Sequence, residues 1–332
     1  MSKRSSKHMA SSRFQPASWL LVALVHMAWA TCAAEPALRL LVPGNVFGGS
    51  KVMARIRVSN VRAEGGTLSW RLAYGERTLQ RGEAAVATDD GGTFSHSFEL
   101  RMPPVKDGVA LRTELTVSVA GANPAQARTV IWIFAPSPWT SRKNEVEAWN
   151  LHLYDPEKTT ADLLESQGVA CHTIRHPSVL EGEKPVALLV GAGVDAGDYR
   201  GLVDGLVGLA RSGGTIVWLE PAGGAVSLPP LEDLDALEFR GAQIVRELDK
   251  RLVFPSSAKP TSSLGLASTR SEVVCEVRKD APGSCWTRLS FHSGGTLIVC
   301  TMPIVAQWET TPAARHFLDA ILRLIHQRKS TL

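Results

Sequence analysis

Apolar and polar residues alternate along short segments in the first half of the chain. Alternation with a period of two predicts strands that bury one face and expose the other. Glycine, proline and aspartate clusters separate these segments, so we expect an antiparallel, Ig-like β-sandwich of about seven strands over residues 36–135. We interpret Trp70 as a core residue between the two sheets rather than as an exposed platform for a sugar. The segments are residues 52–58, 68–74, 94–100, 111–117 and 130–134.

In the second half the pattern changes to apolar runs without alternation. Segments whose apolar residues recur at helical spacing separate these runs. Gly213-Gly214-Thr215 leads into one such run and Gly294-Gly295-Thr296 into another. A strand that is apolar on both faces must be covered on both, which predicts a parallel sheet flanked by helices. We therefore expect a three-layer α/β domain over residues 146–328. The predicted strands are residues 149–154, 169–174, 186–191, 216–220 and 295–300, and the predicted helices are residues 159–165, 199–210 and 312–325.

The remaining stretches of the chain have weaker patterns. Residues 136–145 begin with Pro-Ser-Pro and predict a stiff linker between the two domains. Residues 232–247 fit neither pattern well; their apolar points are Leu234, Leu237 and Ile244, with Leu231 just before them. Residues 255–269 are rich in serine and predict a surface loop. Residues 275–277 and 286–291 predict the two arms of a hairpin.

The first 34 residues have the layout of a secretory signal peptide. Four basic residues precede the apolar run from Trp19 to Ala30, and small residues follow it. We expect cleavage after Ala33 or Ala34 and a periplasmic or extracellular location. The run is short for a membrane span. An uncleaved anchor, which alone would hold the chain at a membrane, and lipoprotein processing before Cys32 are the alternatives.

Net charge and ligand motifs exclude several classes of partner. The full chain carries 36 Lys+Arg and 32 Asp+Glu, and the four basic residues of the leader account for the whole excess. No surplus of positive charge is left to attract nucleic acid, so we expect none as a partner. Gly191-Ala192-Gly193 is shorter than a dinucleotide-binding loop, and no Cys-x-x-Cys pair is present. We therefore predict neither a cofactor nor a metal site.

Four cysteines follow the leader. Cys275 and Cys285 flank a turn-rich stretch, and in an exported protein they could form a disulfide that closes a hairpin. The alternative is that these two, together with Cys171 and Cys300, are buried thiols that act as small apolar residues.

The carboxyl ends of the predicted parallel strands are where α/β proteins place ligands and catalytic groups. Asp155 and Glu220 follow two of these strands and could act as the paired carboxylates of a glycosidase, or Glu220 alone as a general base. His172 beside Cys171 is a third candidate, although neighbouring residues of a strand point to opposite faces. The structural alternatives are a turn at Asp155-Pro156 and an exposed glutamate that closes its strand.

Several short motifs run through the second half of the chain, at residues 153–156, 159–161, 188–193, 295–300, 303, 307 and 312–315. Together they resemble the class I glutamine amidotransferase-like domains, flavodoxin-like in architecture, which occur beside glycoside hydrolase modules in exported bacterial proteins. The resemblance covers residues 146–328 and implies a link to carbohydrate handling. The first half resembles, in pattern, the accessory β-sandwiches that precede such domains.

The chain departs from this family at the catalytic residues. A working member presents its cysteine in a Gly-x-Cys-x-Gly turn after a strand, with a later His-x-Glu pair. The chain contains neither motif, and neither glycine-led strand is predicted to end in such a turn. We therefore expect a pseudoenzyme that binds carbohydrate or another exported protein. The alternative is a glycosidase-like hydrolase that uses Asp155, Glu220 and a histidine.

Overall fold

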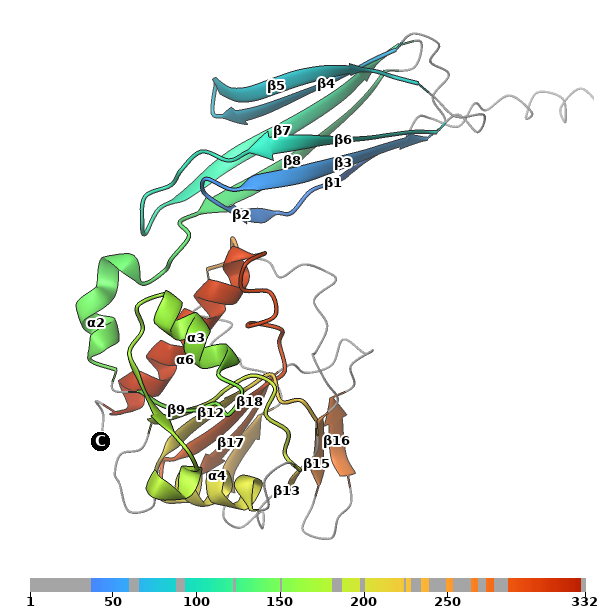
Figure 1. Cartoon of the computed structure of the whole chain (residues 1–332). Helices are drawn as coiled ribbons and strands as arrows, with labels where there is room; N and C mark the ends of the chain where they lie inside the picture. Colours follow the sequence, from blue (N-terminus) through green and yellow to red (C-terminus); the bar gives the residue numbers. More distant parts are fainter. Residues whose placement is uncertain are drawn as a thin grey trace, which may run out of the picture.

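A computed structural model gives the fold of the chain (Figure 1). The predicted leader with its cleavage site and Cys285 of the predicted disulfide lie outside the residues that it describes. The described residues are 37–59, 66–87, 93–121, 124–149, 151–180, 187–197, 201–223, 225–227, 234–238, 249–252, 264–267, 273–277 and 286–329.

Two β-sheets form the first domain, which is β-rich as predicted (Figure 1). The smaller sheet has the strand order β1-β3-β6 and the larger the order β2-β8-β7-β4-β5. Apolar side chains from both sheets meet in one hydrophobic core. The strands are β1 (Ala37–Leu41), β2 (Asn45–Phe47), β3 (Lys51–Ser59), β4 (Thr67–Tyr74), β5 (Arg77–Ala85), β6 (Phe94–Arg101), β7 (Ala110–Ala120) and β8 (Ala125–Phe134).

The alternation seen in the sequence sets which side chains enter this core. On β7, Leu115, Val117 and Val119 are buried, whereas Thr116 and Ser118 between them face outward. The described residues of this domain contain eight strands against about seven expected; β1, β2 and β5 are not among the segments predicted from the sequence. Strand β2 pairs with β8 in parallel rather than antiparallel. All three residues of β2 are buried, so this strand carries no alternation by which the sequence could reveal it.

Trp70 occupies the core position that the sequence predicts. Its ring stacks on Phe98 of the other sheet, with ring centroids 4.3 Å apart. It also covers Gly82, its cross-strand partner on β5, where a Cβ atom would lie 2.2 Å from the indole. The indole therefore packs between the sheets and requires glycine at position 82.

A seven-stranded sheet organises the second domain, in the order β10-β9-β11-β12-β18-β17-β14. The first five strands are parallel, and β17 and β14 continue the sheet in antiparallel pairs. Every residue of β11, β12 and β18 is buried, as the unbroken apolar runs predict. These strands are β9 (Leu151–Tyr154), β10 (Cys171–Ile174), β11 (Ala187–Val190), β12 (Thr215–Leu219), β14 (Leu234–Glu238), β17 (Trp286–Phe291) and β18 (Thr296–Cys300).

Helices pack against both faces of this sheet. Apolar residues of α3 (Thr159–Ser166) and α6 (Pro312–Lys329) share a core with one face. Those of α4 (Leu202–Arg211) share a second core with the opposite face, together with η3 (Pro177–Leu180). No helix in the described part of the chain is long and apolar enough to cross a membrane.

The hairpin predicted from residues 275–277 and 286–291 is wrong. Strand β16 (Val273–Val277) pairs with β15 (Leu264–Ala267), which also pairs with β13 (Ala225–Ser227), in a separate small sheet. Strand β17 instead forms a hairpin with β18, because a tight turn with Gly294 at a φ of 83° joins them. The second glycine phrase is therefore a hairpin turn, and short-range pairing across it determines the neighbour of β17.

The start of α6 and the predicted linker contact both domains. The Arg315 guanidinium lies 4.2 Å from the ring centroid of Phe47 on β2 and donates hydrogen bonds to the carbonyl oxygens of Pro136 (2.5 Å) and Trp308 (2.9 Å). Thr311 donates a hydrogen bond to Asn45 of the β domain at 3.0 Å. The remaining elements here are η2 (Thr140–Arg142) and α2 (Lys143–Glu147).

Candidate functional site

The carboxyl edge of the parallel sheet holds both carboxylates that the sequence proposes. Asp155 follows β9 and Glu220 follows β12, and they are only 3% and 4% exposed. The loop after β11 contacts both of these residues. Gly191 of this loop packs against the Asp155 carboxyl group, and the N–H of Gly193 donates to the carbonyl of Glu220 at 3.0 Å.

The Asp155 carboxylate holds the first turn of α3. Its Oδ2 atom accepts hydrogen bonds from the N–H groups of Thr160 and Ala161, each at 2.8 Å. Free N–H groups at the start of a helix need such an acceptor. Burial raises the pKa of Asp155 above its ordinary value, and the two N–H donors lower it by less. The expected turn at Asp155-Pro156 is therefore also the cap of the next helix.

The Glu220 carboxylate holds the loop between β18 and α6. Its Oε1 atom accepts a hydrogen bond from the N–H of Val305, and the neighbouring N–H groups of Ile304 and Ala306 also act on it. Burial raises the pKa of Glu220 to about 7 against the opposite effect of these donors. The alternative that Glu220 is exposed is therefore wrong.

The backbone at Glu220 is strained. Its φ is 42°, in the left-handed region that side chains other than glycine rarely occupy. Its N–H donates to the carbonyl of Cys300 at 2.6 Å. The sequence predicts no cysteine-bearing turn after β12, and the residue in this strained position is indeed a glutamate. The carboxylate of this glutamate points to main-chain donors.

His172, Cys171 and Cys300 lack the arrangement of a reactive pair in the described part of the chain. His172 is exposed on β10, opposite His152 of β9, with ring centroids 5.7 Å apart. Burial, and after it the charges of Asp155 and Glu165, raises the pKa of the Cys171 thiol, which disfavours a thiolate. Cys300 is buried within β18. No group of three or more potential metal ligands occurs among the described residues.

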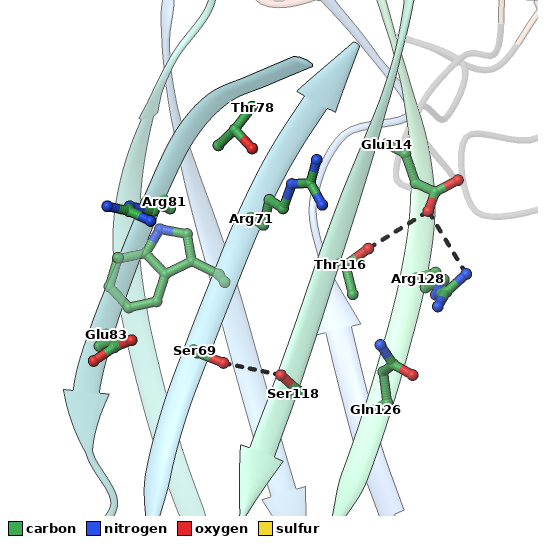
Figure 2. Close-up of a pocket in the computed structure, with 12 residues that line it drawn as sticks. Ser69, Arg71, Thr78, Arg81, Glu83, Glu114, Thr116, Ser118, Gln126 and Arg128 are labelled. Atoms are coloured by element: carbon green, nitrogen blue, oxygen red, sulfur yellow. Dashed lines mark hydrogen bonds and ion pairs between the residues drawn. The ribbon is translucent and has the colours of Figure 1, made fainter. Parts of the chain in front are cut away.

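A second candidate site lies on the outer face of the larger sheet of the β domain. A hollow of about 1170 Å³ runs across β5, β4, β7 and β8, and Figure 2 shows its polar side chains on one side of the sheet. Ser69 and Ser118 form a hydrogen bond of 2.9 Å across it, and Arg128 lies 4.0 Å from Glu114. The hollow is lined by Ser69, Trp70, Arg71, Thr78, Arg81, Gly82, Glu83, Glu114, Thr116, Ser118, Gln126 and Arg128.

The sequence analysis did not predict this hollow, although the sequence does show which of its lining side chains face outward. The outward positions of each alternating strand, such as Arg71 and Thr116, are readable from the pattern. The pattern does not reveal that β7 lies between β4 and β8, because that order depends on pairings distant in the sequence. The side chains converge only once this order is known.

The sequence matches no described protein family and no curated protein. The comparison with solved structures gives very distant similarities. They include a Paenibacillus sp. cycloisomaltooligosaccharide glucanotransferase complexed with cycloisomaltoheptaose (12% identity, 55% of this chain, 27% of that chain, TM-score 0.25). A Bifidobacterium dentium β-glucuronidase complexed with coumarin-3-O-glucuronide has 10% identity over 58% of this chain and 47% of that chain, with a TM-score of 0.23.

The PKD domain of an M14-like peptidase from Thermoplasmatales archaeon SCGC AB-540-F20 has 11% identity over 30% of this chain and 97% of that domain, with a TM-score of 0.19. The chain thus spans about a quarter and about half of the two carbohydrate-active enzymes. At these TM-scores the similarities carry no argument about function.

Proposed function

We propose that the chain is a non-catalytic, exported binding or scaffold protein that acts in extracytoplasmic carbohydrate handling. The observation that carries this proposal is that both candidate carboxylates accept hydrogen bonds from main-chain N–H groups of the protein itself. Asp155 caps α3, and Glu220 holds the loop before α6. A general acid or base must instead reach a proton of the substrate.

The strand order supports an amidotransferase-like, flavodoxin-like second domain. Numbered by position in the chain, the five parallel strands follow the order 2-1-3-4-5, which is that of the flavodoxin-like folds. The helices on both faces agree with a three-layer architecture. The two sheets around one core in the first domain agree with an Ig-like sandwich. In this proposal the fold is kept and the glutaminase chemistry is lost.

The hollow in Figure 2 is the binding surface in this proposal. Its hydroxyl, amide, carboxylate and guanidinium groups offer donors and acceptors to a ligand rich in hydroxyl groups. Ser118 lines the hollow from β7, next to Ser69 of β4.

Binding to a panel of soluble polysaccharides, measured by affinity electrophoresis and calorimetry, tests the proposal. The Ser118→Trp variant fills the hollow and should lose binding. The Ser97→Trp variant places the same ring on an exposed position of β6, in the other sheet, and should keep binding. Failure of the unaltered chain to bind any polysaccharide, or equal binding by both variants, would contradict the proposal.

One observation favours the hydrolase alternative. A pKa of about 7 suits Glu220 to proton transfer near neutral pH, as a glycosidase acid requires. Asp155 would then be its partner. Hydrolysis of aryl glycosides by the purified chain, lost in both Glu220→Gln and Asp155→Asn, would establish this alternative. Turnover that survives both substitutions would exclude these residues as the catalytic pair.

A further inference from the structure

The register of four neighbouring strands places three arginines in one row across the hollow. Arg81 on β5 lies directly opposite Arg71 on β4, and Arg71 is opposite Thr116 on β7. Thr116 is in turn opposite Arg128 on β8. Figure 2 shows these side chains on the same face of the sheet. Directly opposite residues have Cβ atoms about 5 Å apart, so the guanidinium groups of Arg71 and Arg81 can reach the same ligand group.

Two acids, Glu83 and Glu114, flank this row of three arginines in the hollow. Arg128 lies 4.0 Å from a Glu114 carboxylate oxygen, and its side chain is still 65% exposed. Arg71 donates a hydrogen bond to the carbonyl oxygen of Glu76 at 2.8 Å. Within the described part of the chain, neither Arg71 nor Arg81 forms an ion pair. Like charges placed directly opposite each other destabilise a sheet, and a bound anion would relieve that repulsion.

The next row along the same strands carries neutral polar groups beside one acid. Ser69 on β4 lies opposite Glu83 on β5 and opposite Ser118 on β7, and Ser118 lies opposite Gln126 on β8. Two hydroxyl groups and an amide thus lie alongside the arginine row. A ligand that spans both rows would need anionic groups on one side and hydroxyl groups on the other.

We propose that the hollow binds an acidic polysaccharide, with sugar carboxylates on the arginine row and sugar hydroxyls on the row of Ser69, Ser118 and Gln126. This inference rests on the proposed function and specifies its ligand class. Arg71 and Arg128 lie two strands apart, which is about 10 Å. One small anion cannot bridge that separation, whereas a chain of acidic sugars presents several carboxylates to the row. Guanidinium groups bind carboxylates through paired, charge-assisted hydrogen bonds.

A nucleic acid fits this face less well, although it is also a polyanion. Proteins that bind single strands stack the bases on aromatic side chains. Trp70 is the one aromatic residue that lines the hollow in the described part of the chain, and its ring packs inward on Phe98. The chain without its leader also has no net positive charge with which to attract a nucleic acid.

Binding of oligogalacturonate, its methyl ester and a single-stranded DNA oligonucleotide tests the inference, because the ester keeps the sugar and removes the charge. We expect the acid to bind at least about tenfold more tightly than the ester, with an affinity that falls as salt rises. The double variant Arg71→Gln/Arg81→Gln should lose that advantage. Arg39→Gln/Arg57→Gln is the matched control, because it removes an equally exposed opposed pair from the smaller sheet.

The outcomes separate the two proposals. Equal binding of acid and ester would overturn the acidic-ligand inference and leave carbohydrate binding in place. Binding of neither would overturn the acidic-ligand inference, and the proposed function would fall with it only if no polysaccharide of the panel bound. Tighter binding of the oligonucleotide than of oligogalacturonate would overturn the choice of carbohydrate. An equal loss in the control variant would show that the acid responds to overall charge rather than to the arginine row. Unchanged melting curves of both variants would exclude unfolding as the cause.

Discussion

Replacing Glu220 by glutamine should make the protein more stable at alkaline pH. The buried carboxylate has its pKa raised from 4.5 to about 7, because burial disfavours its charge more than the N–H groups of the 304–306 segment favour it. An acid whose folded pKa is raised contributes stability that is fully present below its unfolded pKa, near 4.5. This contribution is lost as pH rises through about 7.

The size of the effect on the free energy of unfolding follows from the shift in the pKa of Glu220. Each tenfold change in proton affinity corresponds to about 1.4 kcal/mol, so the ionised side chain should lower the free energy of unfolding by about 3 kcal/mol above pH 8. Glutamine stays neutral at every pH and keeps an oxygen that can accept the Val305 N–H. The Glu220→Gln variant should therefore match the unaltered chain within about 1 kcal/mol near pH 5 and exceed it by about 3 kcal/mol at pH 8.5.

Urea unfolding at pH 5 and pH 8.5, followed by circular dichroism, measures this difference. Asp155 and His316 also have shifted pKa values, raised and lowered respectively, mainly by burial. Both groups are unchanged in the variant, so the difference between the two proteins isolates Glu220. Glu76→Gln, at an exposed turn, is the control and should leave the free energy of unfolding unchanged at both pH values. A Glu220→Gln protein that loses stability between pH 5 and pH 8.5 as steeply as the unaltered chain would refute the reasoning.

Three further substitutions test the packing at the edge of the sheet, on α4 and at the domain junction. Gly191→Ala should lower the free energy of unfolding by about 1–3 kcal/mol, because its Cβ would lie 2.6 Å from the Asp155 carboxyl carbon. Gly205→Ala on α4, where a Cβ meets nothing within 4 Å, should raise the free energy of unfolding by about 0.5–1 kcal/mol. Thermal melts in which both glycine variants change stability in the same direction would contradict this prediction. Arg315→Ala should cost about 2–4 kcal/mol, because the 7% exposed side chain bonds Pro136 and covers Phe47. Calorimetry should then show the two domains melting separately, and a single unshifted transition would show that Arg315 does not couple them.

Local patterning predicted most individual elements, because local burial is what a pattern of side chains records. The alternation in β7 and the unbroken apolar run of β12 both match the observed burial. Prediction failed where a long-range partner decides the structure. Strand β2 is too short to alternate, and β16 pairs with β15 instead of β17. Such pairings depend on which segments meet after collapse, and no neighbouring residue encodes them.

The same limit explains the uneven outcome for the candidate sites. The position of Asp155 and Glu220 at the strand ends follows from the strand assignments alone, so the sequence could predict it. Their engagement by Thr160 and Val305 N–H groups could not be predicted, because it depends on the path of two loops. A carboxylate that is buried and bonded to its own backbone has the position of a catalytic residue without access to a substrate. The opposed pair of Arg71 and Arg81 has the reverse property, since both are exposed and unpaired by acid within the described residues. The opposed Arg39 and Arg57 of the smaller sheet show that a sheet tolerates such a pair. Arg71 and Arg81 differ because they line a hollow in register with a third arginine, Arg128, and this is why a ligand is the better explanation of the arginine row.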